Sequence, residues 1–282
     1  MKFRTFYKIY YAHRLNKASL INKIYIFVIL PLVYLLNKML LQKIIDLDNL
    51  SKNKKEFFKK DLNFLFQYFN SDKGEYFINQ YQKPIKLEKK LSQGHNYSKY
   101  YEKYFLKKKG DHLNILEIGT FKGNASASFF FYFKNAKIIS GDIFPDLCRY
   151  KSIRIDNIYL DNSKETELQD KIIKKELEFD FIIEDAGHYY KDQIITLFIL
   201  FKVLKSGGVF VIEELDFPNV RKDMNQNDEK PTLKDILLLI KSNKDFNSKL
   251  VSKLQKDYFL DNVLSVEILK GKFNEIAFIQ KK

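Results

Sequence analysis

The sequence predicts an α/β fold in which a doubly wound parallel sheet is completed by a C-terminal antiparallel hairpin. From residue 114 onward, short apolar runs alternate with segments of helical spacing, which is typical of a parallel sheet covered by helices. The last two runs, 262–269 and 274–280, are separated by a short Lys-Gly turn, which favours an antiparallel pair. A chain of 282 residues is long enough to bury a substantial core and to carry an accessory segment.

Five strands are expected in the parallel part of the sheet. Each is a short apolar run whose length suits a buried parallel strand. The expected strands are Asn114–Gly119, Ala136–Ile143, Asn157–Asp161, Phe179–Asp185 and Val209–Glu214. Together with the hairpin they describe a Rossmann-like sheet, in which ligands bind beyond the carboxyl ends of the strands.

Helices are expected in the connections between these strands. Asn124–Phe133 follows the first strand, and Asn124 is placed to cap it. Lys164–Leu177 and Tyr190–Leu204 also have helical spacing. The glycine pair in the sequence KSGG is expected to end the last of these helices as a C-cap.

A helical extension is predicted upstream of the sheet. In Lys55–Phe69 the apolar residues recur at close to 3.6-residue spacing, which predicts a helix. The sequence KKKG at Lys107–Gly110 suits a junction into the main domain. We therefore expect a basic, apolar N-terminal segment at 1–50, a helical cap at 51–110 and the sheet domain at 111–282.

The net charge of +14 belongs to the N-terminal part of the chain. Residues 1–110 carry 23 Lys and Arg against 8 Asp and Glu, whereas residues 111–282 carry 26 against 27. A basic segment can face nucleic acid, anionic lipid or an anionic carrier, and it can also be a solvated helical surface. The single cysteine, Cys148, excludes an intramolecular disulfide and suits a reducing compartment.

The segment Ile24–Leu36 is uncharged and contains Pro31. It is shorter than the roughly 20 apolar residues that a spanning helix needs, and no signal-peptide cleavage pattern follows it. We expect a helix that lies in the membrane interface, with a core or oligomerisation helix and a true span as the alternatives. The basic residues that precede it are Lys2, Arg4, Lys8, Arg14, Lys17 and Lys23. The protein is accordingly expected to be cytoplasmic and peripheral on the inner face of the membrane, and homo-oligomerisation is left open.

The carboxyl ends of the first three strands predict a nucleoside-type cofactor site. The turn EIGTFKG matches neither the dinucleotide fingerprint nor the phosphate loop, which counts against NAD, FAD and nucleoside triphosphates. Asp142 can accept hydrogen bonds from ribose hydroxyls, and Asp161 is placed to meet an adenine amine. The cofactor-binding residues that we expect are Glu117, Gly119, Thr120, Gly123, Asp142, Ile143 and Asp161.

Acidic residues end the next two strands. Asp185 ends the fourth expected strand, and Glu213 and Glu214 end the fifth. These strands are neighbours in a doubly wound sheet, so the three carboxylates converge, and a hard divalent cation such as Mg²⁺ would neutralise them. His188 lies three residues beyond Asp185, where it can take a proton from a hydroxyl without being a metal ligand. The alternative is that these are ordinary strand-end acids and a helix-capping histidine.

Several motifs resemble the macrolide-sugar O-methyltransferases of the macrocin and mycinamicin type, and their homologues encoded with bacterial surface-polysaccharide genes. The motifs are SDKG (Ser71–Gly74), HNYSKYYEKYF (His95–Phe105), ILEIGTFKGNAS, FDFIIEDAGH and LKSGGVFVIEEL. They cover about residues 71–216. Five parallel strands followed by an antiparallel hairpin is also the order of class I S-adenosylmethionine-dependent methyltransferases. The resemblance implies this fold, with S-adenosylmethionine and Mg²⁺ as cofactors.

The resemblance also implies roles for four residues. The family's DDGSH stands here as EDAGH, so Asp185 matches its metal-binding aspartate and His188 matches its catalytic base. The family's IEDL stands here as IEEL, so Glu213 matches a metal ligand and Glu214 replaces an aspartate. A Lys-rich insert separates SDKG from His95, and no role is transferred to Asp72 or His95.

The sequence therefore predicts a metal-dependent O-methyltransferase that moves a methyl group from S-adenosylmethionine to a sugar hydroxyl, in surface polysaccharide or other glycan synthesis. Three alternatives stay open. One is a catechol-type O-methyltransferase, which also binds a metal at this sheet edge. The second is an RNA methyltransferase, although no amino-methylation motif is present and a carboxylate cluster repels phosphates. The third is a non-catalytic membrane-interaction protein with the same sheet.

Overall fold

A computed structural model describes residues 19–40, 44–78 and 91–282. Its centre is a seven-stranded sheet with the strand order β10-β11-β9-β8-β4-β5-β7. The parallel strands are β4 (Asn114–Ile118), β5 (Lys137–Asp142), β7 (Ile155–Tyr159), β8 (Phe179–Glu184) and β9 (Leu204–Ile212). The chain ends in β10 (Val263–Lys270) and β11 (Glu275–Lys281), which pair with each other and with β9 in antiparallel fashion. This arrangement confirms the predicted fold class.

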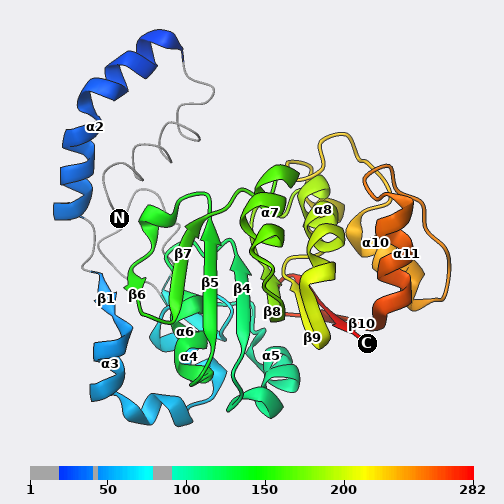
Figure 1. The fold of residues 1–282 in the computed structure, drawn as a ribbon, viewed down its shortest axis with the longest axis horizontal. Helices are drawn as coiled ribbons and strands as arrows, with labels where there is room; N and C mark the ends of the chain where they lie inside the picture. The colour runs from blue at the N-terminus through cyan, green and yellow to red at the C-terminus, as the bar shows by residue number, and fades with distance from the viewer. Residues whose placement is uncertain (1–18, 41–43, 79–90) are drawn as a thin grey trace.

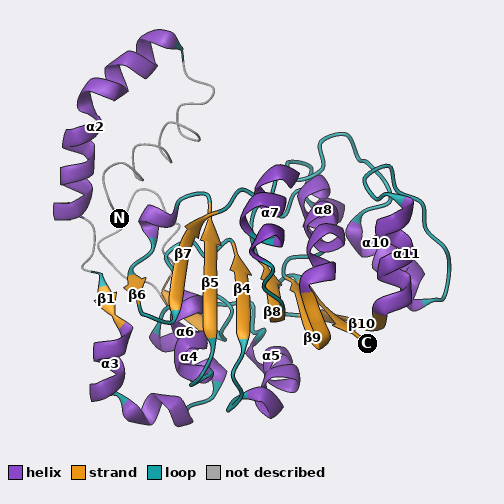
Figure 2. Cartoon of the chain, in the orientation of Figure 1, coloured by secondary structure: helices purple, strands orange, loops and turns teal. Residues whose placement is uncertain are grey.

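Helices cover both faces of the sheet (Figures 1 and 2). Because successive strand residues point to opposite faces, Ile115 of β4 belongs to one core and Leu116 to the other. The first core includes α6 (Asn124–Tyr132) and the N-terminal helices. The second includes four helices: α7 (Glu165–Lys171), α8 (Tyr190–Leu200), α10 (Leu233–Lys241) and α11 (Lys253–Asn262). A fully buried parallel sheet results, which explains why its strands are continuous apolar runs.

The N-terminal helices pack directly on the sheet domain. They are α3 (Leu47–Asn53), the 3₁₀ helix Lys55–Lys59, α4 (Leu62–Tyr68), α5 (Ser98–Phe105) and the 3₁₀ helix Leu106–Lys108. Phe66 of α4 and Phe105 of α5 contact Phe129 of α6 ring to ring, at centroid distances of 5.7 and 6.0 Å. Residues on both sides of the predicted junction at 107–110 thus contribute to one core, and the predicted division into three domains stays a prediction.

The predicted helix at 55–69 is divided in two. Asp61 separates a 3₁₀ helix from α4, and its side chain accepts a hydrogen bond from the Phe64 amide at 2.7 Å. An aspartate at this position caps a new helix rather than continuing the old one. The apolar periodicity was therefore a correct guide to the buried face, while the capping residue decides where the helix begins.

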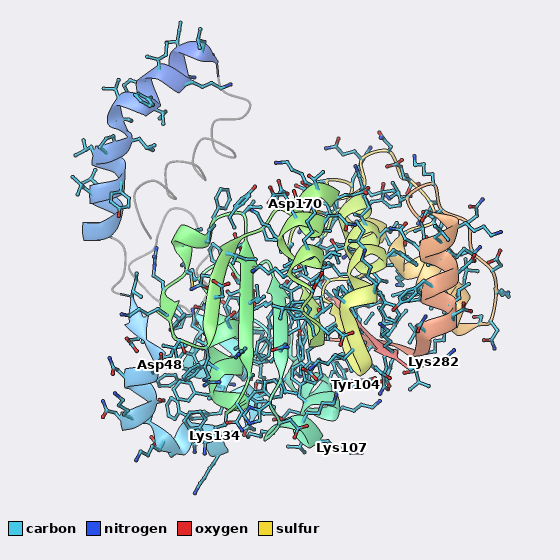
Figure 3. The ribbon with its side chains drawn as sticks, in the orientation of Figure 1. Asp48, Tyr104, Lys107, Lys134, Asp170 and Lys282 are labelled. Carbon is cyan, nitrogen blue, oxygen red and sulfur yellow. The ribbon has the colours of Figure 1, made fainter. Side chains whose placement is uncertain are left out.

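Helix α2 (Leu20–Leu40) lies apart from the sheet and its covering helices (Figure 1). It contains Pro31, and Figure 3 shows its side chains projecting from the ribbon along its length. Most of the basic residues predicted to precede it fall within 1–18, outside the described residues. Within the described ranges, no helix is both long enough and apolar enough to cross a membrane.

Several predicted boundaries are wrong. Asn124 is the first residue of α6, and the N-cap is Gly123, whose φ is 78°. Helix α8 ends at Leu200 and continues as a 3₁₀ turn, Phe201–Val203. The sequence KSGG is not a helix C-cap, because it lies inside β9, where the pairing register with β8 shifts between Phe179 and Phe181. The predicted helix 164–177 is α7 followed by the 3₁₀ turn Ile173–Lys175.

Short elements complete the described chain. Two small sheets join β1 (Ile45–Asp46) to β6 (Tyr150–Lys151) and β2 (Tyr76–Ile78) to β3 (Leu91–Gln93). A 3₁₀ turn at Pro145–Leu147 follows β5, and α9 (Phe217–Val220) follows β9. The connection after β9 therefore contains α9, α10 and α11, three helices that the sequence reading did not predict.

Candidate functional site

A cleft of about 920 Å³ lies at the carboxyl ends of the parallel strands. This volume is at the upper end of the range for small-molecule sites, and its position is the one expected for a ligand in a doubly wound sheet. Of the eleven site residues predicted from the sequence, all except Gly123 line this cleft. The topology therefore brings the predicted cofactor residues and the predicted acidic cluster into a single cavity.

The turn after β4 needs its two glycines for contacts with neighbouring chain segments. Gly119 has a φ of 89°, and a Cβ there would overlap the carbonyl oxygen of Asp185. Gly123 has a φ of 78°, and a Cβ there would lie 2.6 Å from the Sγ of Cys148. Both positions require the left-handed region, which glycine adopts without strain. The turn is thereby packed tightly against the loop that carries Asp185.

Asp142 joins two loops at the floor of the cleft. Its Oδ2 accepts a hydrogen bond from the Phe121 amide and its Oδ1 accepts one from the Phe144 amide, both at 2.7 Å. Asp142 also lines the cleft, so the carboxylate that joins the two loops lies at the ligand side of the sheet edge. Ile143, the residue after Asp142, also lines the cleft.

Asp161 lies beyond the last residue of β7, Tyr159, rather than at the end of that strand as predicted. Its carboxylate accepts a hydrogen bond from the Ser163 hydroxyl at 2.6 Å and pairs with Lys164 at 3.0 Å. Burial alone would raise its pKa, but these contacts outweigh burial and the pKa of Asp161 is lowered. The side chain is therefore an ionised acceptor at neutral pH.

Glu117 is buried at the centre of the sheet edge, with 1% of its surface exposed. Its carboxylate accepts a hydrogen bond from the Ser126 hydroxyl at the start of α6. Burial raises its pKa to about 7, and the positive charge of Lys73 opposes this rise. A buried carboxyl that titrates near neutrality is placed to receive a cationic or hydrogen-bond-donating ligand group.

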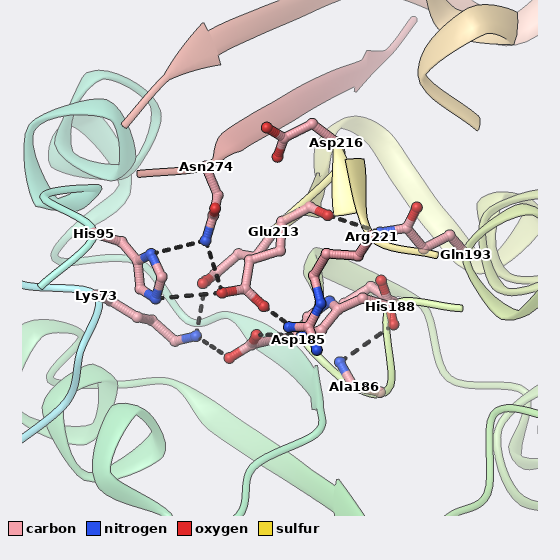
Figure 4. Close-up of polar contacts among 12 residues, drawn as sticks. Lys73, His95, Asp185, Ala186, His188, Gln193, Glu213, Asp216, Arg221 and Asn274 are labelled. Atoms are coloured by element: carbon pink, nitrogen blue, oxygen red, sulfur yellow. Dashed lines mark hydrogen bonds and ion pairs between the residues drawn. The ribbon is translucent and has the colours of Figure 1, made fainter. Parts of the chain in front are cut away.

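The predicted acidic cluster contains a lysine that the sequence reading did not assign. Lys73, in the Ser71–Gly74 turn, is 2% exposed, and its ammonium pairs with Asp185 and with Glu213, the latter at 2.8 Å. Tyr101 of α5 donates its hydroxyl proton to the same Glu213 carboxylate. Burial would lower the pKa of Lys73, but the two carboxylates outweigh burial and raise it above its ordinary value. Lys73 is thus a fixed positive charge inside the cluster (Figure 4).

His188 lies on the other side of the cluster. Its Nε2 is 2.6 Å from Glu214 Oε2 and 3.6 Å from Asp185 Oδ1, and its ring packs edge-on against Phe217. Burial would lower its pKa, but the hydrogen bond and charge of Glu214 outweigh burial and raise the pKa of His188 to about 9. The same pairing lowers the pKa of Glu214 to about 2 against the effect of burial.

Three residues of the site hold a left-handed backbone conformation without being glycine. They are Phe121, His188 and Glu214, with φ values of 47°, 54° and 51°. This conformation costs about 1 kcal/mol or more per residue and persists where the surrounding structure enforces it. His188 Nδ1 is in addition buried with no hydrogen-bond partner among the described residues. Strain and an unpaired ring nitrogen at the same place indicate a functional site.

Two further side chains hold Glu214. His95 Nε2 lies 3.3 Å from Glu214 Oε1, and the Asn274 amide donates to the same oxygen at 3.1 Å. His95 comes from the segment before α5, and Asn274 comes from the turn between β10 and β11. The site is therefore assembled from segments that are far apart in the sequence, and Figure 4 shows them converging.

The donor set suits a divalent cation. Asp185, His188 and Glu214 each offer one ligand atom, and these atoms lie within 4.8 Å of one another. Glu213, a predicted ligand, is instead occupied by Lys73 and Tyr101. His188, predicted as a base outside the coordination sphere, lies within the group. The ligand assignments made from the sequence stay predictions. Among the described residues, Asp185 and Glu214 are the two carboxylates whose ligand atoms lie together with a ring nitrogen of His188.

The sequence reading missed Lys73, Tyr101, His95 and Asn274. Lys73 belongs to SDKG, one of the motifs on which the family resemblance rests. A lysine in such a motif is a candidate partner for the carboxylates of the predicted acidic cluster. Tyr101 lies on the buried face of α5, and the packing of that face is a sufficient reason for an aromatic residue at this position. Asn274 is a turn residue of the hairpin, and no local pattern separates it from an ordinary turn asparagine.

The described chain is similar in structure to known methyltransferases, although no similarity in sequence to a known family was found. No protein-family model matches the chain, and no curated protein matches it. Among solved structures, the MycE methyltransferase from the mycinamycin biosynthetic pathway, in complex with Mg and SAH, is 19% identical with a TM-score of 0.56, over 79% of this chain and 55% of that chain. MycE in complex with Mg, SAH and mycinamycin VI is 18% identical with a TM-score of 0.57, over 79% of this chain and 54% of that chain.

These similarities establish the fold. At this level of identity they show that the described chain shares a Rossmann-like fold with MycE. The chain spans slightly more than half the length of the MycE chains that it matches.

Proposed function

We propose that this protein is a metal-dependent O-methyltransferase that uses S-adenosylmethionine. The observation that carries the proposal is the convergence, in one cleft, of Asp185, Glu214 and His188 with Asp142 and Asp161. The acidic cluster provides a site for a cation and a proton acceptor. The two aspartates provide acceptors for the hydroxyl and amine groups of a nucleoside.

The hydrogen-bond acceptors of the cleft match the donor groups of S-adenosylmethionine. Asp142 and Asp161 present carboxylate oxygens to one part of the cavity, where ribose hydroxyls and an adenine amine would donate. Glu117 presents a carboxyl deeper in the cleft, where the methionyl ammonium would be neutralised. None of the three acids would suit a pyrophosphate, which agrees with the absence of a phosphate-binding glycine motif from the sequence.

The charge of the cluster fits one divalent cation. Three carboxyl groups, Asp185, Glu213 and Glu214, face one ammonium, that of Lys73. Burial raises the pKa of Glu213 to about 8 and the pKa of Asp185 above its ordinary value, so a nearby cation would favour the ionised form of both acids. With all three ionised and His188 neutral, two negative charges remain, and a divalent cation such as Mg²⁺ would balance them with the oxygen ligands that it prefers. Asp185 and Glu214 would hold the cation, and Glu213, fixed by Lys73 and Tyr101, would complete the negative field around it.

His188 is placed to move the proton of the acceptor. A bound divalent cation supplies Lewis acidity toward an acceptor hydroxyl. His188 is protonated at neutral pH in the metal-free cluster because Glu214 raises its pKa to about 9. A cation held by Glu214 and Asp185 would offset the negative charge that keeps His188 protonated, and the imidazole would then be placed to accept the proton of the acceptor hydroxyl. Phe217 packs edge-on against the ring.

The acceptor in this proposal is a sugar hydroxyl, carried on a glycan or surface polysaccharide. The support is the motif resemblance to macrolide-sugar O-methyltransferases and the similarity in fold to MycE, whose structure holds Mg, SAH and mycinamycin VI. Vicinal sugar hydroxyls would present two oxygens to a cation held by Asp185 and Glu214, which would position one of them near His188. S-adenosylmethionine is a cytoplasmic metabolite, so the proposed site of action is the cytoplasm.

Methyl transfer from labelled S-adenosylmethionine to a total cell glycan extract tests the proposal. We expect incorporation that EDTA abolishes and Mg²⁺ restores. His188→Gln should lower the rate at least about 100-fold, the usual range for a general base, while S-adenosylhomocysteine still binds. His112→Gln, an exposed histidine ahead of β4, is the matched control and should retain full activity.

Three results would count against this function. Methyl transfer that continues in EDTA would show that the reaction does not need a metal ion. Transfer to catechols and not to glycans would favour the catechol-type enzyme. Absence of S-adenosylhomocysteine binding by the folded protein would exclude a methyltransferase altogether.

A further inference from the structure

Helix α2 carries an apolar surface that the fold does not use. Nine of its large apolar side chains are exposed, from 42% at Leu36 to 79% at Ile21. Among them, Ile24, Val28 and Leu32 are spaced four residues apart and form a continuous stripe along one face. Exposed apolar residues elsewhere in the described chain occur singly or in small groups, such as Leu254 with Tyr258 on α11, and need no explanation. A contiguous apolar surface of this extent marks a binding interface.

The charge around α2 identifies the partner. Residues 1–45 contain eight Lys and Arg and no Asp or Glu, and the first acidic residue of the chain is Asp46. Lys23 lies in the first turn of the helix and Lys38 lies in the last. A helix whose apolar side chains are flanked by basic residues alone can insert the apolar side chains among the acyl chains of a bilayer and bind anionic headgroups with the basic ones.

We propose that α2 docks this protein on an anionic lipid bilayer. Its exposed apolar side chains enter the hydrocarbon, and the basic residues before and after them bind lipid phosphates. The sheet domain is then held at the membrane surface through the short connection between α2 and β1. This docking is independent of the proposed methyl transfer, because no residue of α2 lines the cleft.

Charge also excludes the simplest competing partner, a second copy of the same helix. Two α2 helices packed side by side would bring together segments that carry only positive charges, whether they lie parallel or antiparallel. Such a pair lacks the complementary charges that specify helix association. A nucleic acid would satisfy the basic residues but would leave the stripe of Ile24, Val28 and Leu32 exposed.

Vesicle sedimentation of the full-length protein tests the proposal. We expect it to sediment with vesicles of phosphatidylcholine containing about 30% phosphatidylglycerol, and less with phosphatidylcholine alone. Binding should weaken when the salt concentration rises from about 0.1 M to about 0.5 M, because screening acts on the headgroup contacts. The double substitution Ile24→Glu and Val28→Glu should lower the vesicle partition coefficient at least about tenfold.

The matched control is Leu254→Glu with Val220→Glu, which places the same two charges on exposed apolar residues of the sheet domain. This control should sediment like the wild type. Thermal unfolding of both variants shows that each is folded, and light scattering without lipid gives the oligomeric state. The proposal is overturned if the α2 variant binds vesicles as the wild type does. It is also overturned if the substitutions convert an oligomer into monomers of 33.7 kDa while vesicle binding is unchanged.

Discussion

Lys73 is a fully buried lysine whose ammonium lies between Asp185 and Glu213. Removing an ion from water costs several kcal/mol, and this cost is offset only when the partners are close and fully hydrogen-bonded. The partners are close here, because both carboxylates pair with the Lys73 ammonium. Glu213 is further hydrogen-bonded, because it accepts the hydroxyl of Tyr101. The lysine therefore acts as a permanent counter-ion, and it restricts the remaining negative charge to the side of the cluster that faces His188.

We predict that Lys73→Met destabilises the metal-free protein by about 3–5 kcal/mol, because it leaves the buried Glu213 and the half-buried Asp185 without their cation. Mg²⁺ should recover part of this loss, since the cation takes up the uncompensated charge. Denaturant unfolding in EDTA and in Mg²⁺ measures both effects. Lys205→Met breaks the more exposed pair with Asp180 and should cost less than about 1 kcal/mol. Equal losses for the two variants would contradict this role of Lys73.

Asn274 contributes to the same cluster through Glu214, whose backbone is in the left-handed region. We predict that Asn274→Ala weakens Mg²⁺ binding about tenfold, because the Glu214 carboxylate loses one of the three side chains that hold it, the other two being His95 and His188. Calorimetric titration of Mg²⁺ measures this change. Asn243→Ala, at another left-handed position far from the cleft in sequence and fold, should leave the affinity unaltered. An unchanged affinity for Asn274→Ala would mean that Glu214 does not bind the cation.

At the scale of elements, Asp142 couples the turn after β4 to the turn after β5. It does so by accepting the amides of Phe121 and Phe144. Asp142→Ala should therefore cost about 3 kcal/mol of stability, the loss of two charge-assisted hydrogen bonds, and weaken S-adenosylhomocysteine binding at least about tenfold. Asp156→Ala, on the exposed side of the adjacent β7, is the control for a lost carboxylate. Weakened stability with full ligand affinity would show that Asp142 has a structural role alone.

The sheet was predictable because buried parallel strands have continuous apolar sequences, and turns separate one such sequence from the next. The helices that follow β9 were not, because α10 and α11 lie in a connection whose capping residues, Thr232 and Ser252, mark local starts without indicating the parent fold. The sequence KSGG was misread because a glycine pair ends a helix and bends a strand equally well. Here Gly207 adopts a φ of 69° within β9.

The site was predictable where its residues follow strands, and not elsewhere. Asp185, Glu213 and Glu214 sit at strand ends, whose meeting place is set by topology. Lys73 and His95 reach the same point from an N-terminal segment whose path over the sheet no local pattern reveals. Long-range contacts of this kind depend on the packing of α4 and α5 against α6, which is a property of the whole core.

At the scale of the whole molecule, stability depends on buried carboxyl groups. Burial raises the pKa of Glu184, at the end of β8, to about 7 from an ordinary value of 4.5. Between these two values the folded protein retains a proton that the unfolded chain has released. The free energy of unfolding therefore falls as the pH rises from about 4.5 to 7, by about 3 kcal/mol from this group, and is level above pH 7.

We predict that Glu184→Gln removes the share of this pH dependence that belongs to Glu184, because an amide replaces the neutral carboxyl without titrating, while Glu117, whose pKa burial also raises to about 7, keeps its own share. Denaturant unfolding between pH 5 and 8, at about half-unit steps, measures the slope. Glu178→Gln, an exposed glutamate just before β8, should leave the slope unaltered. A slope as steep in Glu184→Gln as in the wild type would assign the whole pH dependence to other buried groups of the sheet edge.

The central claim is that one divalent cation is held by Asp185 and Glu214 beside His188. Anomalous diffraction from crystals grown with Mn²⁺ and S-adenosylhomocysteine tests it most directly. We predict a single anomalous peak within about 2.3 Å of a carboxylate oxygen from each of the two acids, with the nucleoside against Asp142. A cleft that contains the nucleoside but no anomalous peak, or a peak bound only outside the cleft, would contradict the claim.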